Sequence, residues 1–168
     1  MKILVAFATR RDTVDGLVEM IGEELRVRGY HVDVLPTRDV QENAIYGAVI
    51  LGGAVYEEHW HPDAMAFAGR FAPQLSRVPT WLFTVRSLFE GAPDVQSESV
   101  RDMQAVAAQL GSVSIMTFDV KREAPGAPAP EASGNYRRAG DWRDPTVVEF
   151  WVDEIHRYLQ TRPTPTFG

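Results

Sequence analysis

The sequence KILVAFATRRDTVDGL (residues 2–17) contains the pattern that decides the fold. Residues 3–7 form an unbroken apolar run, as expected of a strand that helices cover on both faces of a parallel sheet. A polar loop at residues 9–13 follows at once, and a helical pattern comes after it. Open α/β sheets bind ligands at such loops, and the free N–H groups of a helix start favour an anion. The stretch therefore raises the question of a bound phosphate.

The rest of the chain repeats this strand-then-helix pattern. The first helix has one apolar face, made by Val14, Leu17, Val18, Ile21 and Leu25. Four further strands are expected, at residues 30–35, 48–51, 79–84 and 113–118. Helices are expected at residues 62–72, 99–110 and 145–159, the last with Asp144 as N-cap and Pro145 at its first position. Residues 121–140 are rich in Pro, Gly and Ala and predict an exposed loop.

This alternation predicts an α/β fold with one parallel sheet and right-handed crossovers. A strand order of 2-1-3-4-5 would bring the loops after the first, third and fourth strands to one edge of the sheet. We therefore expect the functional site at that edge. Residues 1–160 are expected to form a single domain, and residues 161–168 a flexible tail.

Composition narrows the classes of protein further. The chain has 168 residues, of which 45% are apolar and 24% charged, as in ordinary globular domains. It has no cysteine, which excludes disulfides, zinc–thiolate sites and a cysteine nucleophile. The net charge of −6 argues against a nucleic-acid partner. No apolar run is long enough for a membrane span or a signal peptide, so a cytoplasmic location is expected.

Four segments have a recognisable pattern: the opening strand and loop, residues 51–56 with Trp60, residues 81–83 and residues 140–144. Together they resemble the flavodoxin-domain proteins related to menaquinone-dependent protoporphyrinogen oxidase. The resemblance covers nearly the whole chain. It implies a flavodoxin-like three-layer sandwich around a five-stranded parallel sheet. It also implies an FMN held by three loops, which takes electrons from a substrate such as a porphyrinogen and passes them to a quinone or another acceptor.

In the resembled family, the first loop reads hydroxyl-basic-x-Gly-Ser-Thr and wraps the FMN phosphate. Thr9 and Thr13 keep two hydroxyls here, and Arg10 keeps the basic position, whereas Asp12 replaces the glycine and Val14 the last threonine. A carboxylate about 5 Å from a phosphate repels it by roughly 3 kcal/mol per unit charge at an effective dielectric near 20. Two arginines can offset this repulsion. The residues assigned to the phosphate are Thr9, Arg10, Arg11, Asp12 and Thr13.

The resemblance also assigns residues to the flavin ring. In the second loop these are Ala54, Val55, Tyr56 and Trp60. In the third loop, where the family has small residues and Gly-Pro, they are Thr84, Val85, Arg86 and Ser87. Arg86 is bulky where a flavin edge would lie, so it either reaches a ligand or fills an empty site. No catalytic residue is assigned.

Each assignment has a structural alternative. Residues 9–13 can simply cap the first helix, and Tyr56 and Trp60 can cover the sheet as ordinary aromatics. His59 and His61 are two residues apart with no third ligand in sight, so no metal site is predicted.

Two functions therefore stay open. The first is an FMN-dependent flavoprotein, an oxidoreductase or an electron-transfer protein, with a small-molecule or quinone electron partner. The second is a degenerate flavodoxin-like protein that binds no FMN and serves as a binding or interaction module. Asp12, Val14 and Arg86 favour the second function, and the loop at residues 54–60 favours the first. A homodimer is left open.

Overall fold

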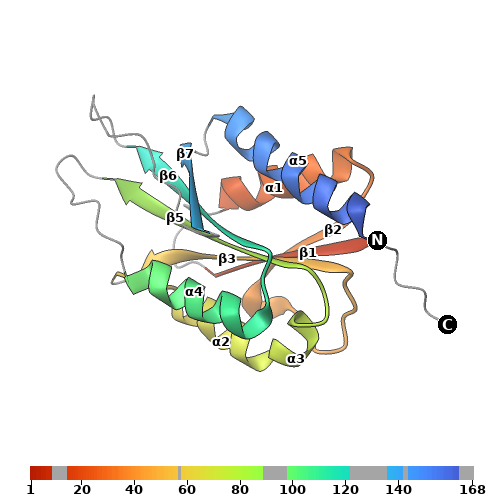
Figure 1. Ribbon diagram of the computed structural model, residues 1–168, viewed down its shortest axis with the longest axis horizontal. Helices are drawn as coiled ribbons and strands as arrows, with labels where there is room; N and C mark the ends of the chain where they lie inside the picture. Colours follow the sequence, from red (N-terminus) through yellow and green to blue (C-terminus); the bar gives the residue numbers. More distant parts are fainter. Residues whose placement is uncertain (9–14, 57, 89–97, 122–135, 142–143, 163–168) are drawn as a thin grey trace.

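A computed structural model places a predominantly parallel sheet between two layers of helices (Figure 1). It describes residues 1–8, 15–56, 58–88, 98–121, 136–141 and 144–162. The strands are β1 (Lys2–Ala8), β2 (His31–Pro36), β3 (Ala48–Tyr56), β4 (His59–Trp60), β5 (Thr80–Leu88), β6 (Ser114–Lys121) and β7 (Tyr136–Asp141). The helices are α1 (Asp15–Val27), the 3₁₀ turn η1 (Thr37–Asp39), α2 (Pro62–Arg70), α3 (Ala72–Leu75), α4 (Glu98–Leu110) and α5 (Pro145–Thr161).

The sheet has the order β2-β1-β3-β5-β6-β7, and β4 pairs antiparallel with β3. Its first five strands are the five predicted from the sequence, in the predicted order, so the flavodoxin-like α/β prediction is confirmed. The expected loop at residues 121–140 is wrong in part, because residues 136–141 pair with β6 as a parallel edge strand. Their sequence, YRRAGD, has no apolar alternation that would predict a strand.

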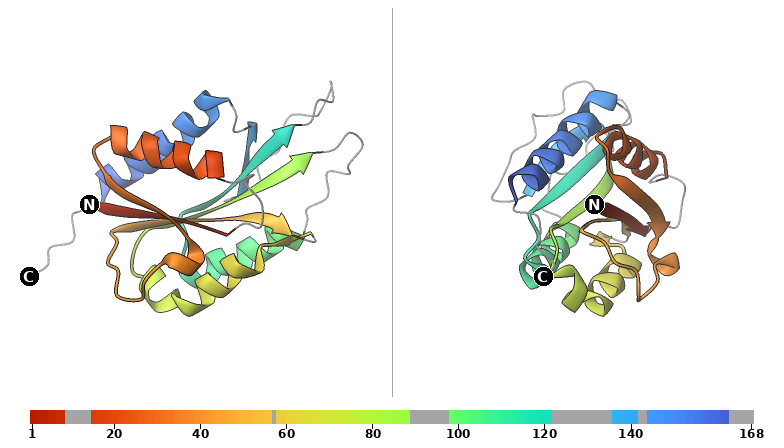
Figure 2. Two further views of the ribbon diagram at one scale, coloured as in Figure 1. Left: turned by 180° about the vertical axis from the view of Figure 1, so that it is seen from behind. Right: turned by 90° about the vertical axis from the view of Figure 1, so that its right-hand side faces the viewer.

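Helices α1 and α5 cover one face of the sheet, and α2, α3 and α4 cover the other (Figure 2). Successive residues of β1 point to opposite faces, so Ile3 and Val5 pack under α1 and α5. Leu4 and Ala6 pack toward α2 and α4. This two-sided burial is the physical reason for the unbroken apolar run that begins the chain.

The predicted apolar face of the first helix and the predicted N-cap of the last helix are confirmed. Leu17, Val18, Ile21 and Leu25 of α1 are each at most 1% exposed, and Val14 lies outside the described residues. Gly29, with φ of +94°, ends the helix in the left-handed conformation that glycine permits. At the start of α5, the Asp144 carboxylate accepts a hydrogen bond from the Thr146 N–H at 3.0 Å, as an N-cap does.

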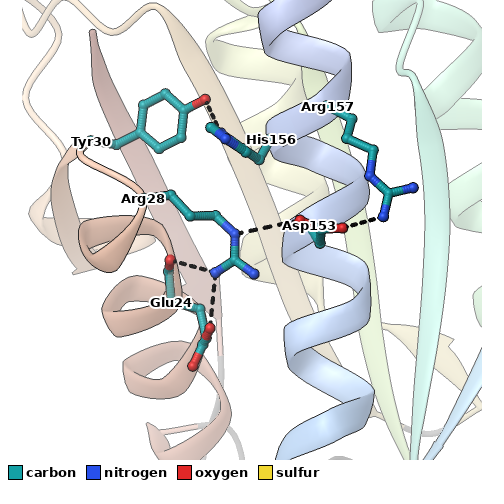
Figure 3. Close-up of polar contacts among 6 residues, drawn as sticks. All are labelled: Glu24, Arg28, Tyr30, Asp153, His156 and Arg157. Atoms are coloured by element: carbon teal, nitrogen blue, oxygen red, sulfur yellow. Dashed lines mark hydrogen bonds and ion pairs between the residues drawn. The ribbon is translucent and has the colours of Figure 1, made fainter.

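Polar contacts join α1 to α5 near the end of α1 (Figure 3). The Arg28 guanidinium donates to the Glu24 carboxylate at 2.9 Å and lies 3.9 Å from the carboxylate of Asp153 on α5. The Tyr30 hydroxyl shares a 2.7 Å hydrogen bond with His156 Nδ1, and burial raises the pKa of Tyr30. These contacts fix the two helices against each other beyond their apolar packing.

A second polar cluster links β2 to the segment before β3. The Tyr46 hydroxyl donates to the Asp33 carboxylate at 2.8 Å, and Lys2 Nζ lies 3.1 Å from the same oxygen. The Tyr46 hydrogen bond, supported by Lys2, lowers the pKa of Asp33 although burial opposes the shift. Burial and the Asp33 carboxylate together raise the pKa of Tyr46 to about 12.

We expect Tyr46→Phe to lower the free energy of unfolding by about 1 kcal/mol at pH 7, because the Asp33 carboxylate loses a donor. Since the folded pKa of Asp33 is depressed, its contribution is present above the unfolded value of about 4 and is lost as pH falls through the folded value. The difference between wild type and variant should therefore shrink in acid. Urea unfolding at neutral and acid pH measures this difference. Thr161→Val is the control, because it removes a hydroxyl that donates to the Tyr158 carbonyl, a group that does not titrate; a loss in Tyr46→Phe that is the same at both pH values would contradict the account.

Candidate functional site

The carboxyl ends of three strands meet at one edge of the sheet. Register pairs Phe7 and Ala8 of β1 with Gly52 and Gly53 of β3, and Gly53 in turn with Thr84 of β5. The ends of these strands therefore lie side by side, as the predicted strand order requires. The predicted phosphate residues Thr9, Arg10, Arg11, Asp12 and Thr13 follow β1 but lie outside the described residues. Their assignment stays a prediction.

The second predicted loop is a strand and a hairpin. β3 continues to Tyr56, and β4 turns back to pair with it, Trp60 opposite Val55 and His59 opposite Tyr56. The expectation that residues 54–56 form a loop is therefore wrong, because backbone pairing with β4 and β5 extends the strand. Ala54 and Val55 are half-buried. The side chain of Tyr56 lies outside the described residues.

The Trp60 ring packs inside the protein. It is 1% exposed, and its indole N–H donates to the Phe83 carbonyl at 3.2 Å. It lies against Gly53, where a Cβ atom would come within 2.9 Å of the indole nitrogen. In this structure Trp60 is a packing residue of the core on the α2 and α4 side, which is the structural alternative to a flavin-facing ring.

Gly52 leaves room for an aromatic ring on the face of β3 opposite to the Trp60 ring. A Cβ atom at this position would overlap the ring of Phe83, which packs in the core under α5. The Phe83 ring also meets the Trp151 ring edge-to-face, with centroids 5.9 Å apart. The glycine pair therefore admits one large aromatic residue on each face of the central strand.

The third predicted loop also begins later than expected. β5 runs to Leu88, and Thr84, Val85, Arg86 and Ser87 pair in order with β6 residues 117–120. Thr84 and Val85 are buried, and the Thr84 hydroxyl donates to the Gly53 carbonyl at 2.8 Å. Thr84 lies in the strand as predicted, whereas the expectation that the loop begins at Val85 is wrong, because β6 pairs with β5 as far as Leu88. The side chains of Arg86 and Ser87 lie outside the described residues.

The β3–β4 hairpin, residues 54–60, is attached to the start of α4. The Glu58 carbonyl accepts a hydrogen bond from the Ser99 N–H at 2.7 Å. The Asp102 carboxylate accepts from the Trp60 N–H at 3.2 Å and shares a 2.9 Å hydrogen bond with His59 Nδ1. The sequence offered no signal for Asp102, because 42 residues separate it from Trp60.

The histidine pair has separate structural partners. His59 contacts Asp102, whereas His61 is 2% exposed and its Nδ1 accepts from the Asp63 N–H at 3.0 Å as the N-cap of α2. Within the described ranges, no group of three or more His, Asp or Glu side chains is arranged to hold a metal ion.

The helices in the same ranges include none with the length and apolar character to cross a bilayer.

Comparison with known proteins identifies related folds. A family model described as flavodoxin domain matches residues 4–117. No curated protein matches the chain. The solved structure of a rubredoxin oxygen:oxidoreductase from Desulfovibrio gigas superimposes with a TM-score of 0.66 at 14% identity, covering 95% of this chain and 36% of that one. The chain thus spans about a third of that protein.

Stand-alone flavodoxins match over nearly their full length. A flavodoxin from the domain Archaea gives a TM-score of 0.60 at 12% identity, covering 95% of this chain and 99% of that one. A Fusobacterium nucleatum flavodoxin bound to flavin mononucleotide also gives 0.60, at 15% identity, with 94% and 98% coverage. Identities this low establish a shared fold and leave the ligand to be argued from the site.

Gly52→Ala should destabilise the protein by about 3 kcal/mol or more, because the added methyl overlaps the enclosed Phe83 ring. Combining it with Phe83→Leu should cost less than the sum of the two single changes. Gly69→Ala in α2 is the matched control, since a Cβ there meets nothing within 4 Å; it should be neutral or stabilising. Chemical unfolding measures all four variants, and additive losses at Gly52 and Phe83 would refute the clash.

Glu58→Asn should raise the melting temperature by about 2 °C. Glu58 has φ of +68°, a left-handed conformation that costs a Glu residue free energy and that Asn tolerates better. Glu58→Gln is the control, because it removes the same charge while keeping the strained backbone. Thermal unfolding of both variants checks this, and an equal rise in the Gln variant would assign the effect to charge instead.

Proposed function

Because the chain belongs to the flavodoxin domain family, we propose that it binds FMN at the carboxyl edge of β1, β3 and β5 and transfers electrons. The observation that supports this most is the strand register, which brings the carboxyl ends of β1, β3 and β5 to one edge of the sheet. When bound, FMN supplies the capacity to accept and donate electrons.

The described residues at this edge are compatible with a flavin ring. The half-buried Ala54 and Val55 are small apolar residues near the end of β3, on opposite faces of the strand. The segment after β1 leads directly into α1, whose first N–H groups would favour the FMN phosphate. Arg10 and Arg11 in that segment would supply the positive charge. In this proposal, the protein holds and orients the cofactor with these groups.

The electron partner belongs to the same proposal at a finer level. The motif resemblance suggests a porphyrinogen as the electron donor and a quinone as the electron acceptor. Both suggestions rest on this resemblance. A small-molecule or quinone partner fits the net charge of −6 better than a nucleic acid does. A homodimer is kept as a further proposal.

A flavin-free interaction module is the second candidate. It is favoured by the enclosure of Trp60, which offers no indole face to a flavin at this edge. Asp12, where the resembled family has glycine, favours it as well, since its charge opposes a phosphate.

An absorbance scan of the purified protein followed by titration with FMN separates the two candidates. We expect a flavin band or saturable binding of added FMN. Asp12→Gly should tighten FMN binding by about tenfold or more, because it removes a carboxylate and frees the backbone. Asp12→Asn removes the charge alone and should recover part of that gain. Absence of binding by both the wild type and Asp12→Gly would favour the flavin-free module.

A further inference from the structure

Asp102 connects α4 to the hairpin that borders the proposed site. Figure 1 shows the far end of β3 beside the start of α4. One oxygen of the Asp102 carboxylate, Oδ2, accepts the Trp60 N–H at 3.2 Å and lies 2.9 Å from His59 Nδ1. The Asp102 side chain is 23% exposed, so part of this contact is shielded from water. A single carboxylate thus holds both residues of β4.

The strand that Asp102 holds has little support of its own. β4 contains two residues, and a hairpin ladder that short is marginal by itself. The outward N–H groups of an edge strand need acceptors, which a further strand would normally provide. The Asp102 carboxylate provides that acceptor for Trp60.

The rest of the hairpin is tied to its surroundings at other points. The turn is held by the Ser99 N–H on the Glu58 carbonyl, and the Trp60 ring by its bond to the Phe83 carbonyl. The first contact holds the turn and the second holds the Trp60 side chain. The Asp102 contact instead holds the backbone of β4 directly opposite Val55. Loss of Asp102 would therefore release the segment next to Val55 while leaving the ring packed.

We propose that Asp102 is a positioning residue for the ligand site, which fixes the β3–β4 hairpin and thereby sets the affinity for FMN. This inference rests on the proposed function for its ligand. Asp102 acts through the hairpin backbone and has no need to touch the ligand. When the hairpin is held in place, the strand end at Ala54 and Val55 keeps one arrangement, and binding then costs less conformational entropy.

The first test compares FMN affinity among variants of α4. Asp102→Ala should weaken FMN binding by about tenfold, because the Trp60 N–H loses a charged acceptor. Asp102→Asn keeps an oxygen acceptor and should restore most of the affinity. Glu98→Gln is the charge-matched control, since Glu98 lies one turn earlier and pairs with Arg101 at 3.3 Å. Unchanged FMN affinity in Asp102→Ala, with or without a lower melting temperature, would overturn the inference.

The second test needs no FMN. Hydrogen exchange of the ligand-free protein should be faster over residues 54–60 in Asp102→Ala than in the wild type and Glu98→Gln. Should the wild type bind no FMN, the proposed function fails, and faster exchange still supports Asp102 as the residue that positions the hairpin. Unchanged exchange over residues 54–60 would overturn the inference whether or not FMN binds.

Discussion

The structure depends on close packing at two glycines in the central strand. Gly52 leaves room for the Phe83 ring on one face of β3, and Gly53 leaves room for the Trp60 ring on the other. The Phe83 ring is stacked edge-to-face with Trp151, which ties this face to α5. The Trp60 ring belongs to the core that α2 and α4 cover. Both helical layers are therefore aligned on one short segment of β3, where any side chain would force them apart.

The same segment marks where the core ends and the candidate site begins. Ala54 and Val55 follow the glycine pair directly and are half-buried, whereas Gly52 and Gly53 are buried. Thr84 fixes the strand by donating to the Gly53 carbonyl, and the hairpin is bonded to α4. A site built on paired strands keeps its geometry better than one built on loops. The core packing and the site geometry are thus consequences of one constraint.

The sequence carried enough information for the sheet order and the main helices, since buried apolar runs and the 3.6-residue period are local signals. It could not specify where strands end. β3 and β5 extend past their apolar cores because β4 and β6 offer them backbone partners, and β7 forms from a stretch without a strand pattern. The role of Asp102 could not be predicted for the same reason, because it depends on a contact with Trp60, 42 residues away in the chain. The aromatic rings that pack against Gly52 and Gly53 could not be deduced from the sequence either, because they come from β5 and β4.

The enclosure of Trp60 shifts the balance of interactions that FMN would make at this edge. An exposed indole would stack on a flavin ring and add about 1 kcal/mol beyond the area it buries. Because that ring packs against Gly53 and donates to the Phe83 carbonyl, Trp60 would not supply this stacking contribution. In the proposed site, FMN would then depend more on its phosphate, for which the sequence offers the opposing charges of Arg10, Arg11 and Asp12. On that proposal, the net charge of residues 9–13 would matter more than the shape of the fold in determining whether FMN binds.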